Sequence, residues 1–193
     1  MLELQKELQK PLSADQIEFR VQSINKGGYA TVLAYKDARV DMNRLNKVFG
    51  VGFWQRKHEF INGKEYCTVE VWNSEINQWC GVQDVGTVSN TEAEKGQSSD
   101  AFKRACFNLG IGIELYDYPE MSIKLNNNEW RLNESKKDKW GKPKVETTWE
   151  FRLKEWLWFT QFDDNNNLTF IAAKDDKGAM RFQWGQYKKE GEG

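Results

Sequence analysis

Segments that alternate between apolar and polar residues open the chain. Residues 17–21 place an apolar side chain at every second position, which is the period of a half-buried strand, and Gly27-Gly28 ends the pattern. Residues 29–35 predict a second strand. The apolar positions then follow the helical period, which predicts a first substantial helix over 37–48 that ends at Gly50.

A β-hairpin is the clearest local signal. Asn62-Gly63 lies between two strand-like segments, 54–61 and 64–72, and this pair best supplies the positive φ angles of a two-residue type I′ turn. A third strand-like segment, 78–85, follows a polar loop. Together these segments predict a three-stranded antiparallel meander.

Residues 91–109 predict a long helix with Gly110 as its C-cap. Its core-facing stripe is Phe102, Ala105, Cys106 and Leu109, at positions i, i+3, i+4 and i+7. Lys103 and Arg104 lie off that stripe, with Phe107 between them one turn on. The two cations and the ring are therefore expected on the exposed side. A solvated helix face is the alternative to a binding surface.

The sequence changes character after Tyr118-Pro119. The loop-like stretches are 126–128, the lysine-rich 136–144 and 165–167. We interpret the lysine-rich stretch as solvated, with a ligand site as the alternative. Residues 149–162 are rich in aromatics and fit either a helix or a strand, whereas 168–172 and 180–184 look like short strands. The chain is thus expected to be α+β, with a small mixed, aromatic-rich C-terminal appendage over 119–193.

Composition indicates a folded chain with free thiols. The 193 residues carry 28 Lys and Arg against 29 Asp and Glu, a net charge of -1, and include 9 Trp, 6 Tyr and 11 Phe, too much apolar surface for a disordered protein. No apolar run approaches the length of a membrane span, and residues 1–10 lack a signal peptide's apolar stretch, so the cytoplasm is the expected location. Cys67, Cys80 and Cys106 have no CxxC spacing, which argues against a disulfide framework or a thiolate zinc site.

The sequence contains few residues or motifs that would indicate an enzyme. His58 is the only histidine, so a His-rich metal centre is excluded and one candidate general base remains. Neither a GxxxxGK[ST] loop nor a GxGxxG motif is present, so neither ATP nor another cofactor is expected. Asp84 with Glu92 or Glu94 could form a metal-dependent nuclease site, an alternative that no spacing favours.

Several stretches together resemble a known family. They are Ala34-Tyr35-Lys36-Asp37-Ala38-Arg39, then Asn43, Asn46, Phe49-Gly50 and Trp54, then Asp84-Val85-Gly86, and finally Lys95 and Ser99-Asp100-Ala101-Phe102-Lys103-Arg104-Ala105 up to Leu109-Gly110. In order and spacing they are similar to the conserved core of the Rad-fifty-two type single-strand annealing proteins, and most similar to the phage members called Sak.

The resemblance implies a β-β-β-α core over residues 1–118, a meander packed on a long helix, that assembles into an oligomeric ring or arc. Such proteins bind single-stranded DNA in a positive groove around the ring and anneal complementary strands without ATP, in homologous recombination or phage DNA repair. If the chain is encoded by a phage, its location would be the bacterial host's cytoplasm.

The resemblance also assigns roles to residues. Lys103 and Arg104 would contact the sugar-phosphate backbone, and Lys95 and Arg39 would line or flank the same groove. The motif residues with expected architectural roles are Asp84, Gly86, Asp100 and Gly110. We expect Phe107 to pack between elements or subunits, because a continuous base stack against protein would hinder pairing.

The sequence departs from the family pattern in two places, and these departures limit which family properties can be expected of this chain. The segment 87–90 is short and lacks Lys and Arg, so a second, outer DNA site is in doubt, and nothing after Pro119 matches the eukaryotic tail that binds a recombinase. A single-strand-binding protein stays a candidate partner. Although each subunit is nearly neutral, aligned copies of Lys103 and Arg104 would form a continuous positive track. The alternative to annealing is a non-catalytic interaction module of a replication or virion complex.

Overall fold

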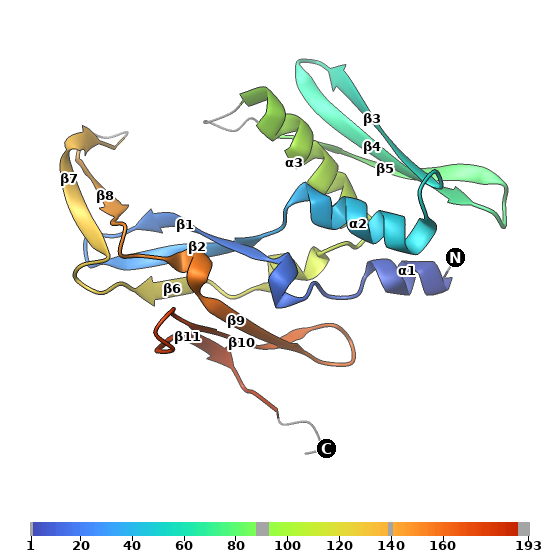
Figure 1. The fold of residues 1–193 in the computed structure, drawn as a ribbon. Helices are drawn as coiled ribbons and strands as arrows, with labels where there is room; N and C mark the ends of the chain where they lie inside the picture. The colour runs from blue at the N-terminus through green and yellow to red at the C-terminus, as the bar shows by residue number, and fades with distance from the viewer. Residues whose placement is uncertain (1, 88–92, 139–140, 189–193) are drawn as a thin grey trace. The chain divides into compact units, whose positions relative to one another are not determined.

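The computed structural model describes residues 2–87, 93–138 and 141–188, and within them helices combine with a larger number of strands (Figure 1). The predicted α+β class is confirmed. The chain divides into two compact units: the first contains residues 1–12 and 36–116, and the second contains residues 13–35 and 117–193.

The first unit contains an antiparallel sheet in the order β3-β4-β5. Its elements are α1 (Leu2–Leu8), α2 (Ala38–Phe49), β3 (Trp54–Ile61), β4 (Lys64–Asn73), β5 (Gln78–Val85), α3 (Ala93–Asn108) and most of the 3-10 helix η2 (Ile113–Asp117). The predicted hairpin turn is confirmed, because Asn62 and Gly63 have φ angles of 51° and 75°. Cys67 pairs with both His58 and Asp84, so β4 is the central strand.

Helix α2 begins and ends as its sequence predicts. Asp37 is the N-cap, and its carboxylate accepts a hydrogen bond of 2.8 Å from the Arg39 amide. Gly50 ends the helix with a φ of 87°. On the same helix, Nη1 of Arg44 donates to three carbonyl oxygens at and just beyond the end of α1, which satisfies acceptors that the short helix leaves open.

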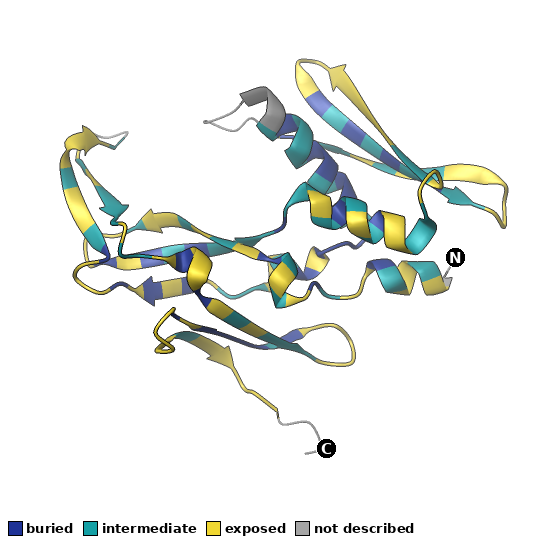
Figure 2. Cartoon of the chain, viewed as in Figure 1, coloured by how far each residue is buried: buried dark blue, intermediate teal, exposed yellow. Residues whose placement is uncertain are grey.

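The core of the first unit lies between α3 and the sheet, and Figure 2 shows its buried positions along α3 and β4. The helix contributes Phe102, Ala105 and Cys106, and β4 contributes Cys67, Val69 and Val71. The helical stripe predicted from the sequence is therefore confirmed as core. Full burial of a Val or Phe side chain stabilises the fold by about 1.5–3 kcal/mol, so this interface fixes which face of α3 is turned away from the sheet.

The second unit contains two antiparallel sheets, ordered β1-β2-β6 and β11-β10-β9, and a β7-β8 hairpin. Its elements are η1 (Ala14–Gln16), β1 (Glu18–Ile24), β2 (Tyr29–Tyr35), β6 (Met121–Lys124), β7 (Trp130–Lys137), β8 (Pro143–Thr147), η3 (Leu153–Glu155), β9 (Leu157–Phe162), β10 (Leu168–Lys174) and β11 (Met180–Gly185). Val32, Ile123, Trp156 and Ile171 meet in one buried cluster, so the two sheets share a core.

Two C-terminal segments differ from expectation. The lysine-rich stretch 136–144 is only partly a loop, because Lys136 and Lys137 end β7 and Lys144 lies in β8. Its alternating polar residues pair across the hairpin, and Asn133 faces Lys144. Residues 149–162, which fitted helix or strand, divide into η3 and β9.

The compact units do not follow the predicted ranges 1–118 and 119–193. Strand β2 pairs with β6 from Tyr29 opposite Lys124 to Val32 opposite Met121, so residues 13–35 fold together with the C-terminal part. The functional boundary of an annealing core stays a prediction. Over the described ranges, no helix combines the length and the apolar character needed to cross a membrane.

Candidate nucleic-acid interface

Lys103 and Arg104 flank the buried stripe of α3. Successive side chains on a helix point in directions about 100° apart. Two consecutive residues that both lie outside the core stripe therefore face different neighbouring elements. Both side chains are half-buried, and each has an acidic neighbour on a different element. The side of α3 expected to be exposed is thus only partly so: Phe107 is also half-buried, and its ring packs 4.9 Å from that of Tyr116, in line with the packing role expected for it.

Arg104 is held against β5 by Asp84. Its Nε lies 3.3 Å from Asp84 Oδ1, and Asn108 donates from Nδ2 to the other carboxylate oxygen at 3.3 Å. The Arg104 side chain remains 37% exposed. A guanidinium carries five donors, and in the described part of the chain its terminal nitrogens make no further hydrogen bond, so they can meet a phosphate while Nε stays anchored.

Lys103 faces α2 instead. The pKa of Asp37 is lowered mainly by a hydrogen bond from Arg39, whose Nε lies 2.8 Å from Asp37 Oδ1, and the charge of Lys103 adds a smaller contribution in the same direction. Burial raises the pKa of Asp41, and the charge of Lys103 opposes that increase. The Arg39 side chain is 77% exposed. Asp37 thus brings Arg39 and Lys103, which are far apart in sequence, into one electrostatic neighbourhood.

Beneath this surface lies a buried ion pair. Lys36 is 1% exposed, its Nζ lies 2.5 Å from Asp41 Oδ1, and it also donates to the Ile111 carbonyl. The ammonium stands 3.9 Å from the centre of the Phe107 ring. Burial lowers the pKa of Lys36 and raises that of Asp41 to about 6, since each charged form loses hydration. The pair ties the start of α2 to α3 and to the chain that follows it.

Sequence reasoning missed this pair, although Lys36 belongs to the motif that carries the resemblance. A signal was available: Asp41 precedes the buried Leu45 by four residues, which puts a carboxylate on the core stripe of α2. A buried carboxylate requires a partner, so this position predicts a buried cation nearby.

The motif glycines and aspartates join β5 to α3. A Cβ on Gly86 would lie 2.2 Å from the Gln97 carbonyl oxygen, so only glycine allows the strand's end to approach the helix this closely. Asp100 accepts two hydrogen bonds of 2.9 Å from Thr87, through its amide and its hydroxyl. Gly110 follows α3 with a φ of 95°, the left-handed conformation favoured at a helix end.

Two further cations belong to the same unit. Arg56 of β3 is exposed and lies over the buried Phe102 ring at 4.7 Å, a contact that the sequence analysis did not anticipate. Lys95 falls within α3, but its side chain lies outside the described residues. The structure therefore brings Arg39, Lys103 and Arg104 to the surface around α2, α3 and β5, and describes no contact of Lys95.

The side chains that could in principle act in catalysis make structural contacts instead. His58 Nδ1 lies 3.0 Å from Glu65 Oε1, and the Ser98 hydroxyl donates to that same oxygen, so the serine hydrogen bond goes to the carboxylate and not to the imidazole. Burial raises the pKa of the Cys67 and Cys106 thiols, which disfavours nucleophilic thiolates. Within the described ranges, no group of three or more His, Cys, Asp or Glu side chains could hold a metal ion. Of the proposed nuclease residues, Glu92 and the side chain of Glu94 lie outside the described residues.

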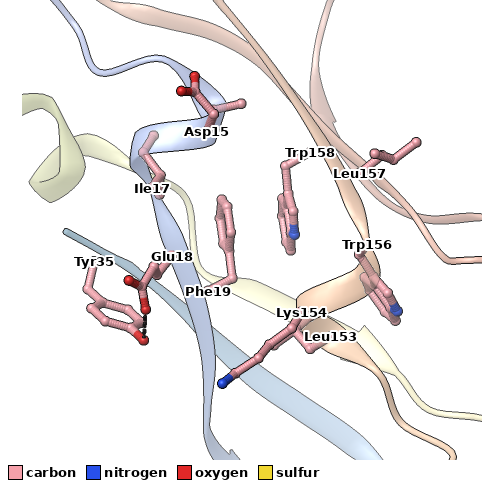
Figure 3. A pocket seen from close by; sticks show the side chains of 11 residues that line it. Asp15, Ile17, Glu18, Phe19, Tyr35, Leu153, Lys154, Trp156, Leu157 and Trp158 are labelled. Atoms are coloured by element: carbon pink, nitrogen blue, oxygen red, sulfur yellow. Dashed lines mark hydrogen bonds between the residues drawn. The ribbon is translucent and has the colours of Figure 1, made fainter. Parts of the chain in front are cut away.

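The second unit has an aromatic pocket of about 730 Å³ (Figure 3). Phe19 and Trp158 lie side by side in it, with ring centres 3.6 Å apart and planes 4° from parallel. Asp15 and Glu18 contribute two carboxylates to its wall, against the single ammonium of Lys154. This charge balance disfavours phosphates and suits apolar or basic side chains, so the pocket differs in character from the surface around α3.

Comparison with known proteins agrees with the motif-based resemblance. Residues 1–133 match the Rad52/22 family of double-strand break repair proteins. Two relatives named single-stranded DNA-binding protein DdrA are 32% identical over 123 residues in Deinococcus radiodurans and 31% identical over 133 residues in Deinococcus deserti. These matches cover 61% and 65% of this chain and only 57% and 62% of the relatives' own lengths.

The family match includes α2, the β3-β4-β5 sheet and α3, which carry the basic residues and the motif glycines described above, and it covers more than half of the chain. The chain therefore belongs to the Rad52/22 family of double-strand break repair proteins.

Proposed function

We propose that this protein binds single-stranded DNA through its phosphates and anneals complementary strands without ATP, in recombination or DNA repair. The observation that carries the proposal is the trio of Arg39, Lys103 and Arg104 on the first unit, in which Asp37 holds Arg39 and Asp84 holds Arg104. Membership of the family and the similarity to the DdrA single-stranded DNA-binding proteins support the same ligand.

The chemistry of the surface suits annealing. A protein that anneals strands must hold the backbone and leave the base edges free, and phosphate contacts do this without reading sequence. Asp84 and Asp37 limit the rotamers of their partner cations, so less entropy is lost when a phosphate binds. No step in annealing needs a nucleophile or a general base. In this proposal β3, β4, β5 and α3 form the β-β-β-α core.

Assembly completes the proposal. One nearly neutral subunit offers few phosphate contacts, whereas copies aligned in a ring or arc, as in the phage Sak members, would present the trio repeatedly along one strand. Each phosphate neutralised adds about 0.7 to the salt slope on single strands, so a few contacts in each subunit sum to tight binding. A single-strand-binding protein would be the partner that delivers coated DNA.

The two alternatives lose ground for different reasons. A nuclease centred on Asp84 would need that carboxylate for a metal, but Asp84 already accepts hydrogen bonds from Arg104 and Asn108. An interaction module has one supporting observation, the aromatic pocket beside Phe19, and this pocket lies in the second unit. It is compatible with a protein partner in addition to DNA.

The experiment mixes two complementary labelled strands with the protein in the absence of nucleotide and follows duplex formation. We expect annealing by the wild type and a large loss with Lys103→Ala or Arg104→Ala, each of which lowers the salt slope of single-strand binding by about 0.7 for every subunit contact. Lys64→Ala, at the exposed β3–β4 turn, is the matched control and should behave as wild type. Wild-type affinity and slope in both α3 variants, with an unchanged oligomeric state, would reject the assignment.

A further inference from the structure

A basic groove lies in the second unit, between β1 and β8. Its walls are residues 21–26 on one side and residues 138 and 142–147 on the other, and they enclose about 520 Å³. Both flanking strands are sheet edges in the described part of the chain, because β1 pairs only with β2, and β8 pairs only with β7. Figure 1 shows the β7–β8 hairpin beside the end of the β1–β2 hairpin.

Three ammonium groups dominate the charge of this groove. Lys26, Lys142 and Lys144 are all exposed, and no ion pair or side-chain hydrogen bond engages their Nζ atoms within the described ranges. Such free, solvated ammonium groups are available to an anionic ligand at little cost in broken contacts.

The carboxylates of the groove are already occupied. Glu146 binds Arg131 at 2.7 Å and Lys136 at 3.3 Å, so its negative charge is offset by two cations. The first of these contacts is the main reason that the pKa of Glu146 falls to about 2. Asp138 accepts a hydrogen bond of 2.9 Å from the Lys142 amide, in the turn of the hairpin. The neutral amide leaves the charge of Asp138 in place, but with Glu146 offset by Arg131 and Lys136 the three lysines still give the groove a net positive charge.

Polar groups on β1 complete the surface. The β1–β2 register shifts between Val21 and Ser23, which leaves Gln22 as the extra residue of a bulge. Gln22 and Ser23 are exposed and line the groove. Amide and hydroxyl side chains beside lysines are the groups that contact the sugar-phosphate backbone in protein–DNA complexes.

An inserted peptide strand fits the groove less well. A strand hydrogen-bonded to both edges would hold them about 9.6 Å apart, twice the usual spacing between strands. Over part of their length, β1 and β8 approach to within 8 Å between Cα atoms. The space is thus too narrow over part of its length for an inserted strand, whereas its exposed lysines suit a flexible polyanion that lies across it.

We infer that the β1–β8 groove is a second contact site for the phosphodiester backbone of single-stranded DNA, with Lys26, Lys142 and Lys144 as its phosphate ligands. This inference rests on the proposed function, since the strand that occupies the groove is the same class of ligand. It assigns a role in DNA binding to the second unit, where the family resemblance assigns none.

The test compares three variants by fluorescence anisotropy with a labelled oligo-dT strand over a range of salt. The groove variant is Lys26→Ala with Lys142→Ala and Lys144→Ala, and its matched control is Lys154→Ala with Lys177→Ala and Lys188→Ala, which removes the same charge from exposed positions of the same unit. The third variant combines Lys103→Ala with Arg104→Ala.

We expect the groove variant to lose about 2 from the salt slope, about 0.7 for each phosphate contact, and more than about tenfold in affinity at low salt, while the control keeps both. Equal behaviour of groove variant, control and wild type overturns the inference and leaves the proposed function standing. If the groove variant aggregates but its soluble fraction binds DNA with wild-type affinity and salt slope, the inference is also overturned. The lysines would then serve only to protect the strand edges from pairing with another chain. Absence of wild-type binding rejects the proposed function itself. Loss of binding in the groove variant alone supports the groove and rejects the α3 assignment.

Discussion

Removing the ammonium of Lys36 should destabilise the first unit strongly. In Lys36→Met the apolar stem is kept, but Asp41, which has no exposed surface, loses its ion pair with the ammonium, and the bond to the Ile111 carbonyl is lost. Breaking a buried ion pair by removing one partner costs about 3–5 kcal/mol, since an uncompensated charge is left in a medium that solvates it poorly.

The loss should depend on pH in a defined direction. Burial already raises the pKa of Asp41 to about 6, and without Lys36 the pKa rises further. A group with a raised folded pKa contributes stability at low pH that is lost as pH rises through that value. As the pH falls from 8 to 6, the free energy of unfolding of the variant should rise relative to that of the wild type by up to about 1.4 kcal/mol for each pH unit. The reason is that Asp41 of the wild type takes up its proton only near pH 6.

Urea unfolding monitored by circular dichroism at pH 8 and pH 6 measures both effects. The matched control is Lys36→Met combined with Asp41→Asn, which removes both charges and keeps the volume of the side chain. This double variant should recover most of the stability and lose the extra pH dependence. A single variant as stable as wild type, or equally destabilised at the two pH values, would refute the reasoning.

Two further substitutions test contacts in each unit. Gly86→Ala should cost about 3 kcal/mol in urea unfolding, because its Cβ would meet the Gln97 carbonyl oxygen, whereas Gly63→Ala, with a φ of 75° in open space, should cost about 1 kcal/mol; equal losses would contradict the close approach. In the second unit, Arg181 is only 9% exposed and lies 2.7 Å from Glu129, so Arg181→Ala should lower stability by about 3–5 kcal/mol, and an unchanged thermal midpoint would count against that ion pair.

Local chemistry explains why much of the first unit could be predicted. Asn62-Gly63 specifies its own turn, Asp37 caps the helix that follows it, and Gly50 ends that helix, all through interactions within a few residues. The stripe on α3 is equally local, because a helix that buries Phe102 must bury its neighbours one turn away. These elements needed no knowledge of what lies across the core.

Features that depend on distant partners could not be predicted in the same way. The pairing of β2 with β6 joins residues 89 to 95 positions apart and places residues 13–35 in the second unit. Residues 149–162 gave an ambiguous period because a 3-10 turn and a strand share that window. The divergence of Lys103 and Arg104 depends on which elements flank α3, namely α2 with its acidic residues and β5 with Asp84.

That divergence bears on how a chain with a net charge of -1 could hold a polyanion. Several cations of the first unit, Arg39 and Arg104 among them, are paired with carboxylates, which weakens the far field, while Arg104 is partly exposed and is held by Asp84 through Nε. Long-range attraction would then be modest and short-range capture specific to phosphate. A strand held in this way can be released and exchanged, which is what annealing requires, whereas a uniformly basic surface would retain both strands and slow their pairing.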